Sequence, residues 1–164
     1  MTRILGIDPG LNATGWGLLE IAPDGAAGLR WGTIRPPHGP LSERLNNINW
    51  RVKELIERHR PDAVAIERPF NHKNVKTAVL LGQAQAAAMI AAAAMGVTVH
   101  EYPPRQVKEA VAGLGSADKP AVKQALIARL GLAELDAPAD AADALAIAFC
   151  HHLMTPIEEK LEIL

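Results

Sequence analysis

Residues 3–21 read RILGIDPGLNATGWGLLEI, and this stretch decides the fold. Its first part, from Arg3 to Asp8, is apolar enough to form a short buried strand. Pro9 and Gly10 stop that strand, and a second strand is expected from Thr14 to Ile21. The sequence therefore predicts two strands joined by a short turn, with a carboxylate at the point where the first strand ends.

The elements that follow predict an α/β protein. A third strand, expected at Leu29–Ile34, extends the first two into an antiparallel meander. Helices then alternate with two further strands, and such crossovers make these strands parallel to the first. The expected helices are Leu41–Arg60, Asn74–Met95, Arg105–Ala112, Asp118–Leu130 and Pro138–Met154, and the later strands are Asp62–Glu67 and Val97–Tyr102. This order indicates a five-stranded mixed sheet flanked by helices on both faces.

The composition fits one domain, expected over residues 1–154, followed by a tail at 155–164. The chain is 49% hydrophobic, and its single cysteine excludes an internal disulfide and suits a reducing cytoplasm. The start of the chain lacks a signal-peptide pattern, and the apolar run 84–97 is too short to span a bilayer. We therefore expect a cytoplasmic protein with no membrane association. The net charge of -1 argues against nucleic-acid binding by bulk charge.

Carboxylates stand at places where the sheet can bring them together. Asp8 and Glu67 each close a strand, and the carboxyl ends of parallel strands line one crevice. Asp140 and Asp143 lie three residues apart on the last helix, so they share a face, and the alanines around them permit close approach to the sheet. Converging carboxylates repel one another unless cations lie between them, and Mg²⁺ or Mn²⁺ prefers such oxygen ligands. Two such ions can hydrolyse a phosphodiester. The alternative is that Asp8 serves a turn and Asp140 caps the last helix.

Four strings carry a resemblance to a known family: GIDPGLNATGWG at 6–17, AIERPF at 65–70, RQVKEAVAGLGSADK at 105–119 and PADAADALAIA at 138–148. In order and spacing they resemble the RuvC-type Holliday junction resolvases. The resemblance implies a ribonuclease-H-like fold and a homodimer that nicks two opposing strands of a four-way DNA junction. It also implies Mg²⁺ or Mn²⁺ as cofactor, two ions per active site, and work beside the RuvA–RuvB branch-migration complex. By motif position, the catalytic and metal-binding acids fall on Asp8, Glu67, Asp140 and Asp143, and the position of Asp140 varies in the family between Asp and His.

Basic and aromatic residues near these strings are candidate DNA contacts. Phe70 either anchors the next helix in the core or stacks on bases at the junction centre, which is worth about 1–3 kcal/mol per base; the resemblance favours stacking. In the family, lysines at the positions of Lys108 and Lys119 lie near the cut phosphate, which implies electrostatic support of the transition state and a catalytic role for Lys119. Ser116 either binds phosphate or, like Asp118, caps the following helix. The expected DNA contacts are Arg68, Phe70, Lys73, Lys76, Arg105, Lys108, Ser116 and Lys119.

The helix expected after Asn74 is apolar on more sides than one sheet can cover. One explanation is that it is sandwiched between the sheet and other helices. The other is a two-fold homodimer, which would hold two active sites in fixed relation on a four-way junction. We expect Leu81 or a near neighbour at that interface, where Gly82 and the alanine run allow close packing.

Other functions stay open from the residues alone. Asp8, Gly10, Thr14 and Gly15 loosely resemble the phosphate loop of the actin and sugar-kinase group, although that group normally needs two such domains. A non-catalytic nucleic-acid-binding module and a related nuclease acting on another substrate, such as an RNA–DNA hybrid, are further alternatives. The Cys-His-His cluster at 150–152 raises a zinc hypothesis, which neither a second cysteine nor a well-spaced histidine pair supports.

Overall fold

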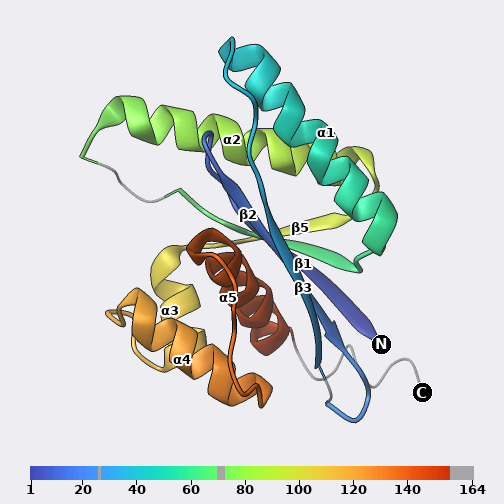
Figure 1. Ribbon diagram of the computed structural model, residues 1–164, viewed down its shortest axis with the longest axis vertical. Helices are drawn as coiled ribbons and strands as arrows, with labels where there is room; N and C mark the ends of the chain where they lie inside the picture. The colour runs from blue at the N-terminus through green and yellow to red at the C-terminus, as the bar shows by residue number, and fades with distance from the viewer. Residues whose placement is uncertain (26, 70–72, 156–164) are drawn as a thin grey trace.

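The computed structural model describes residues 1–25, 27–69 and 73–155, so Phe70 and the expected tail beyond Thr155 lie outside the described residues. Within these ranges the strands form one sheet in the order β3-β2-β1-β4-β5 (Figure 1). The first three strands form the predicted antiparallel meander, and β4 and β5 run parallel to β1. The mixed sheet expected from the sequence is therefore confirmed. The strands are β1 Thr2–Asp8, β2 Thr14–Ile21, β3 Ala27–Ile34, β4 Ala63–Glu67 and β5 Thr98–Tyr102.

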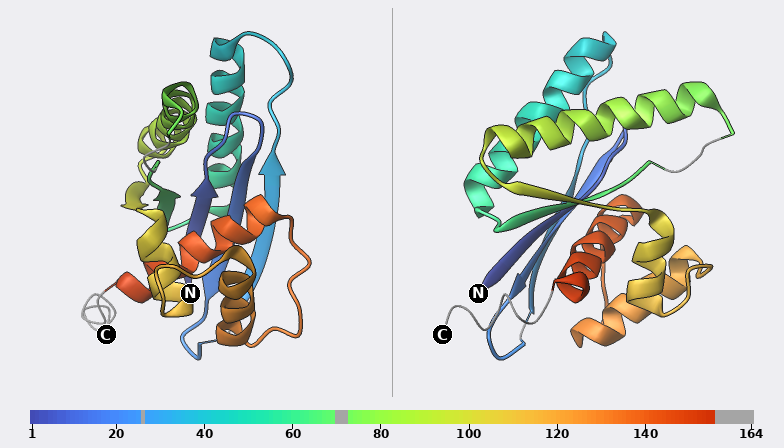
Figure 2. Two further views of the ribbon diagram at one scale, coloured as in Figure 1. Left: turned by 90° about the vertical axis from the view of Figure 1, so that its left-hand side faces the viewer. Right: turned by 180° about the vertical axis from the view of Figure 1, so that it is seen from behind.

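The helices cover both faces of the sheet, as predicted. Helices α1 and α2 pack on one face, and α3, α4 and α5 pack on the other (Figures 1 and 2). The side chain of Asn74 accepts a hydrogen bond from the Thr77 N–H at 3.2 Å and caps α2 as expected. The helices are α1 Leu41–His59, α2 Val75–Ala94, α3 Pro104–Ala112, α4 Lys119–Leu130 and α5 Ala139–Met154.

The two cores follow from the alternation of side chains along β1. Ile4 points into the core shared with α3, α4 and α5, whereas Leu5 and Ile7 point into the core shared with α1 and α2. All three side chains are buried, and each such burial is worth about 1.5–3 kcal/mol. The strand that carries Asp8 is thus fixed from both sides and holds its last residue in a defined place.

Helix α5 lies directly on the sheet because glycines face it. A Cβ atom on Gly6 would collide with the backbone of Ala144, and one on Gly15 would collide with the backbone of Asp140. The alanines of α5 complete this contact from the helix side, as the sequence suggested. The close approach brings the first turns of α5 to the end of β1.

By length and composition, α2 is the one helix among the described residues that could cross a membrane. The apolar run 84–97 considered in the sequence is shorter than the apolar part of this helix, because apolar residues from Val75 onward belong to the same helix. Core helices of soluble proteins can be equally long and apolar. In this fold α2 buries Ala84, Ala88 and Ala91 in the core that it shares with α1.

Candidate active site

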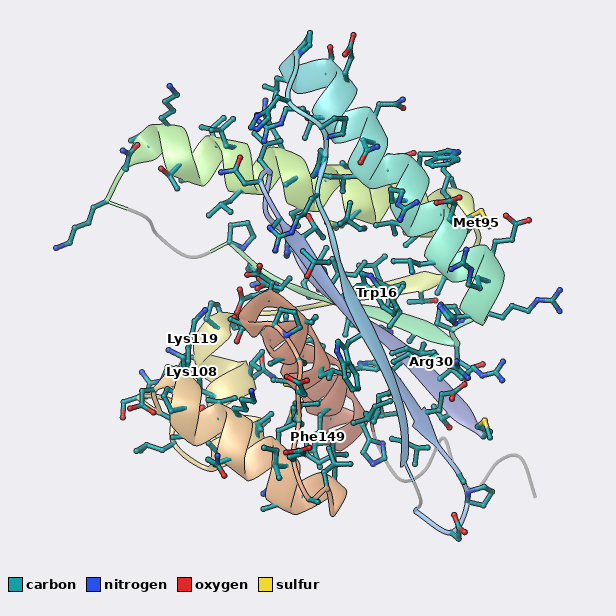
Figure 3. All side chains as sticks on the ribbon, viewed as in Figure 1. Trp16, Arg30, Met95, Lys108, Lys119 and Phe149 are labelled. Atoms are coloured by element: carbon teal, nitrogen blue, oxygen red, sulfur yellow. The ribbon has the colours of Figure 1, made fainter. Side chains whose placement is uncertain are left out.

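A cavity of about 330 Å³ opens where β1 and β4 end. Asp8 and Glu67 line it from the two strands, and Asp143 lines it from α5. Lys108 from α3 and Lys119 from α4 complete its polar wall, and both labelled lysines lie beside the first turns of α5 (Figure 3). The remaining lining residues are all apolar: Pro9, Pro69, Leu81, Pro104, Val107, Val122 and Ala146. The structure therefore brings together three of the four predicted acids from three distant segments.

Asp8 and Glu67 lie abreast because of the register between β1 and β4. Ile7 pairs with Ile66, so the next residue on each strand is the acid. Burial, followed by the charge of Glu67, raises the pKa of Asp8 to about 8, and the two side chains share a hydrogen bond. Burial also raises the pKa of Glu67. In the absence of a cation, a proton on Asp8 thus relieves the repulsion within the pair.

Asp143 is neutralised in a different way. The ammonium group of Lys119 donates a hydrogen bond to Asp143 Oδ2 at 2.8 Å. This hydrogen bond and the charge of Asp143 raise the pKa of Lys119. Because the Lys119 side chain is largely exposed, it can leave Asp143 at little cost.

Asp140 occupies the edge of the site. Pro138 stands at the N-cap of α5 and no side chain caps that end, so the alternative that Asp140 is the cap is wrong. Asp140 is absent from the lining of the cavity, and its charge is the smallest of the contributions that raise the pKa of Asp8. Asp140 therefore lies close enough to act on the acid pair but farther out than Asp143.

The donor set suits a hard divalent cation. Three carboxylates converge with no competing soft ligand in the cavity lining, and carboxylate oxygens are the ligands that Mg²⁺ and Mn²⁺ prefer. Among the described residues, no group of three His, Cys, Asp or Glu side chains is arranged as a metal site in the present rotamers. The shared proton and Lys119 take up the negative charge instead. Displacing them would leave carboxylate oxygens from all three segments available to a cation.

Several predicted DNA contacts do not line the cavity. Arg68 follows Glu67 directly and is exposed, with its Nε atom 3.9 Å from Glu101 Oε1. Lys73 and Lys76 are exposed at the start of α2. All three lie next to the segment that holds Phe70, which is outside the described residues.

The remaining predicted contacts are Arg105 in α3 and Ser116 in the loop between α3 and α4. Arg105 is exposed and its side chain lies over Gly115, where an added Cβ would be 2.7 Å from its Cγ atom. Ser116 is exposed in this loop. Asp118 rather than Ser116 caps α4, because its side chain accepts a hydrogen bond from the Ala121 N–H at 2.9 Å. Ser116 is exposed and is thus left to face solvent.

The outer face of α2 carries apolar side chains near Leu81 in the sequence, but not Leu81 itself. Leu81 lines the catalytic cavity rather than the outer surface. The exposed apolar side chains are instead its neighbours Val75, Val79 and Ile90, which are 75%, 54% and 62% exposed. Residues two apart on a helix point to nearly opposite sides, so the spacing from Val79 could have separated Leu81 from this face.

Cys150 and His151 of the Cys-His-His cluster are buried in the core. His151 is buried, its Nδ1 atom lies 2.7 Å from the Tyr102 hydroxyl, and its ring is 4.3 Å from that of His100 between centroids. Burial lowers the pKa of His151 to about 4 and raises the pKa of Cys150 to about 11. These contacts give His151 and Cys150 a packing role.

The sheet topology and the acids at its strand ends define a nuclease domain of the ribonuclease-H-like class. The family model for Crossover junction endodeoxyribonuclease RuvC matches residues 4–151. The chain therefore belongs to the RuvC family of crossover junction endodeoxyribonucleases. This membership excludes the sugar-kinase alternative.

Relatives and solved structures agree with the assignment. The chain is 46% identical over 159 residues to a crossover junction endodeoxyribonuclease RuvC of Chloroflexus aurantiacus, covering 96% of this chain and 97% of the relative. It is 44% identical over 151 residues to that of Dehalococcoides mccartyi, covering 92% of each. The structure of T. thermophilus RuvC in complex with Holliday junction substrate matches with a TM-score of 0.85 and 38% identity, over 93% of this chain and 94% of that one. The ribonuclease-H-like fold implied by the sequence is thereby confirmed.

Proposed function

We propose that this chain resolves four-way (Holliday) DNA junctions by paired, metal-dependent nicks in opposing strands during recombination and repair. The observation that carries the proposal is the cavity in which Asp8, Glu67 and Asp143 meet beside Lys108 and Lys119. The T. thermophilus relative, whose structure holds a Holliday junction substrate, supports the choice of DNA. We propose further that the protein works in the cytoplasm beside the RuvA–RuvB branch-migration complex, as the family resemblance implies.

The acids would hold two Mg²⁺ or Mn²⁺ ions per active site. Asp8, Glu67 and Asp143 are the inner ligands in this proposal, and Asp140 is an outer one. Ions of this kind supply an activated water and stabilise the leaving oxygen. The rigid pairing of β1 with β4 fixes two of the ligands, so little reorganisation is needed around the phosphate.

Two lysines complete the chemistry. Lys108 and Lys119 enter the cavity from α3 and α4, on the side that faces the acids. A phosphodiester that undergoes hydrolysis gains negative charge in the transition state, which positive groups in the cavity stabilise. Lys119 would exchange its bond with Asp143 for a phosphate oxygen when DNA binds.

The exposed basic residues around the cavity would hold the arms of the junction. Arg68, Lys73, Lys76, Arg105 and Ser116 are exposed, and contacts of this kind would position the backbone without reading its sequence. In this proposal Phe70 stacks on bases at the junction centre. Phe70→Ala should then slow the cutting of intact junctions more than that of junctions already unpaired at the centre. An equal loss on both, with a lower melting temperature, would assign Phe70 to the core.

We propose a homodimer that uses the outer face of α2. An exposed stripe of Val75, Val79 and Ile90 on one helix is an apolar surface that a second copy can cover by a two-fold interface. Val79→Asp should produce monomers that lose paired nicking, whereas Thr77→Asp, on the same helix, should stay dimeric. Sedimentation velocity at micromolar concentration makes the comparison. A monomeric wild type that still makes paired nicks would refute the dimer.

The substrate is tested by comparing four-way junctions with linear duplex and RNA–DNA hybrid of the same sequence. The proposal expects Mg²⁺- or Mn²⁺-dependent nicking of the junction alone. Preferential cutting of the hybrid would favour a related nuclease with another substrate. Tight junction binding with no nicking in either metal would favour a binding module.

A further inference from the structure

A second hollow, of about 380 Å³, adjoins the catalytic cavity between α4 and the start of α5. The two hollows share Lys119, Val122 and Asp143 in their walls, so they adjoin at these residues, and together they are called the trough here. Past these shared residues the trough is lined by Lys123 and Gln124. None of the proposed catalytic or DNA-contacting residues other than Lys119 and Asp143 belongs to this extension.

The floor of the extension is apolar. Val122 and Ala142 are 8% exposed and Leu126 is fully buried, so these side chains form a packed wall with little free surface. A sugar with its phosphate at the rim fits such a surface, because the apolar floor contacts the sugar while the charged group stays at the edge.

The charge of the extension is positive once internal pairs are subtracted. Asp143 is the single acid in its lining, and that carboxylate is already bound to Lys119. Lys123 forms no ion pair within the described ranges. Helix α5 begins at the edge of the hollow without a capping side chain, which adds the partial positive charge of its first turn.

We infer that this extension binds a phosphodiester of the cleaved strand, next to the scissile one, through Lys123 and Gln124. The inference rests on the proposed nuclease function. A strand whose scissile phosphate lies between Asp8 and Lys119 must leave the cavity, and the trough offers a path over α4. The lysine supplies charge and the amide supplies a neutral hydrogen bond, so the pair fixes the strand along its length and reads no base.

Replacement of single phosphates by neutral methylphosphonates tests the inference. Junctions carrying one such replacement at each position near the cut are titrated with the wild type and with Lys123→Ala, in EDTA, by fluorescence anisotropy. For the wild type, a methylphosphonate at one position flanking the cut should weaken junction binding about 3- to 10-fold, as expected for the loss of a charged hydrogen bond at a partly exposed site. Lys123→Ala should bind the unmodified junction about 3- to 10-fold more weakly than the wild type does. At the flanking position alone, a methylphosphonate should no longer weaken binding by this variant. The affinity of the variant should also depend less steeply on salt concentration.

Two variants keep the result interpretable. Lys53→Ala removes a similarly half-buried lysine from α1, on the opposite face of the sheet, and should bind like the wild type. Lys123→Arg keeps the charge, so a methylphosphonate at the flanking position should again weaken binding. The inference is overturned if Lys123→Ala responds to every replacement as the wild type does, or if Lys53→Ala has the same effect. Because binding is read without metal, a failure to cut junctions would count against the proposed function alone.

Discussion

Replacing Asp8 with asparagine should stabilise the metal-free protein while it removes an essential ligand. Burial and the charge of Glu67 raise the pKa of Asp8 from 3.8 to about 8. At neutral pH the folded protein must therefore keep a proton that the unfolded chain releases. At about 1.4 kcal/mol per pH unit, the interval from 3.8 to about 7 corresponds to about 4 kcal/mol. Because solvent at the cavity mouth screens the side chain, we expect Asp8→Asn to recover about 1–2 kcal/mol of this cost.

The pH dependence has a definite sign. For a carboxyl whose folded pKa is raised, the cost is absent below the unfolded pKa of 3.8 and grows until pH reaches about 8. Urea unfolding in EDTA should thus show a gain for Asp8→Asn at about pH 7.5 that shrinks at about pH 5. Asp136→Asn, an exposed acid in the loop before α5, should show no gain at either pH. An Asp8→Asn protein no more stable than the wild type at about pH 7.5 would refute the reasoning, as would a gain that is larger at the lower pH.

Three further predictions concern other parts of the structure. Gly15→Ala should lower stability by about 1–3 kcal/mol in thermal melts, because its Cβ would collide with the backbone of Asp140. The control Gly82→Ala has no heavy atom within 4 Å of the new Cβ, so its stability should be unchanged or higher by up to about 1 kcal/mol. The wild type should lose stability as pH falls from about 6.5 to about 4, since the unfolded chain takes up a proton at His151 before the buried imidazole does, and His151→Asn should lose less. Urea titrations across this interval measure the stability of both proteins, and the same pH profile in both would count against the lowered pKa of His151. Lys119→Ala should slow single-turnover cleavage of bound junctions by about 10- to 100-fold, and a rate within about twofold of the wild type would remove the lysine from the chemistry.

The parts of the site that the sequence could predict depend on the topology of the sheet. A carboxylate at the end of each of two parallel strands must lie at one edge, so the meeting of Asp8 and Glu67 followed from the order of elements. The approach of α5 followed from small residues on both surfaces, and Gly6 and Gly15 indeed lie beneath it.

The parts that could not be predicted depend on the angles at which helices meet the sheet. Asp140 and Asp143 share a face of α5, yet only Asp143 lines the cavity, because the first turn of the helix rests on Gly15 and holds Asp140 at the edge. The bond between Lys119 and Asp143 depends on how α4 enters, which the spacing of residues along the chain does not determine. The place of Leu81 in the cavity lining also depends on how α2 lies against the sheet, which an almost uniformly apolar helix does not reveal by composition alone.

A buried polar contact on α2 was also missed. Gln85 is a buried polar side chain in the middle of that helix, and its Nε2 atom donates to Glu101 Oε1 at 2.9 Å. Glu101 in turn lies near Arg68, so α2, β5 and the residue after Glu67 are linked. A glutamine within an alanine run is a signal of such a contact, because a buried amide needs a partner.

The most direct test of the account is the cutting of a synthetic four-way junction by the wild type, Asp8→Asn and Glu67→Gln, each with Mg²⁺, with Mn²⁺ and with EDTA. The wild type should make paired nicks in opposing strands with either metal and none in EDTA. Both variants should lose cutting yet bind the junction as tightly as the wild type or more tightly, because each loses a metal ligand and a negative charge that faces phosphate. Wild-type cutting rates in either variant, or cutting by the wild type in EDTA, would contradict the carboxylate metal site.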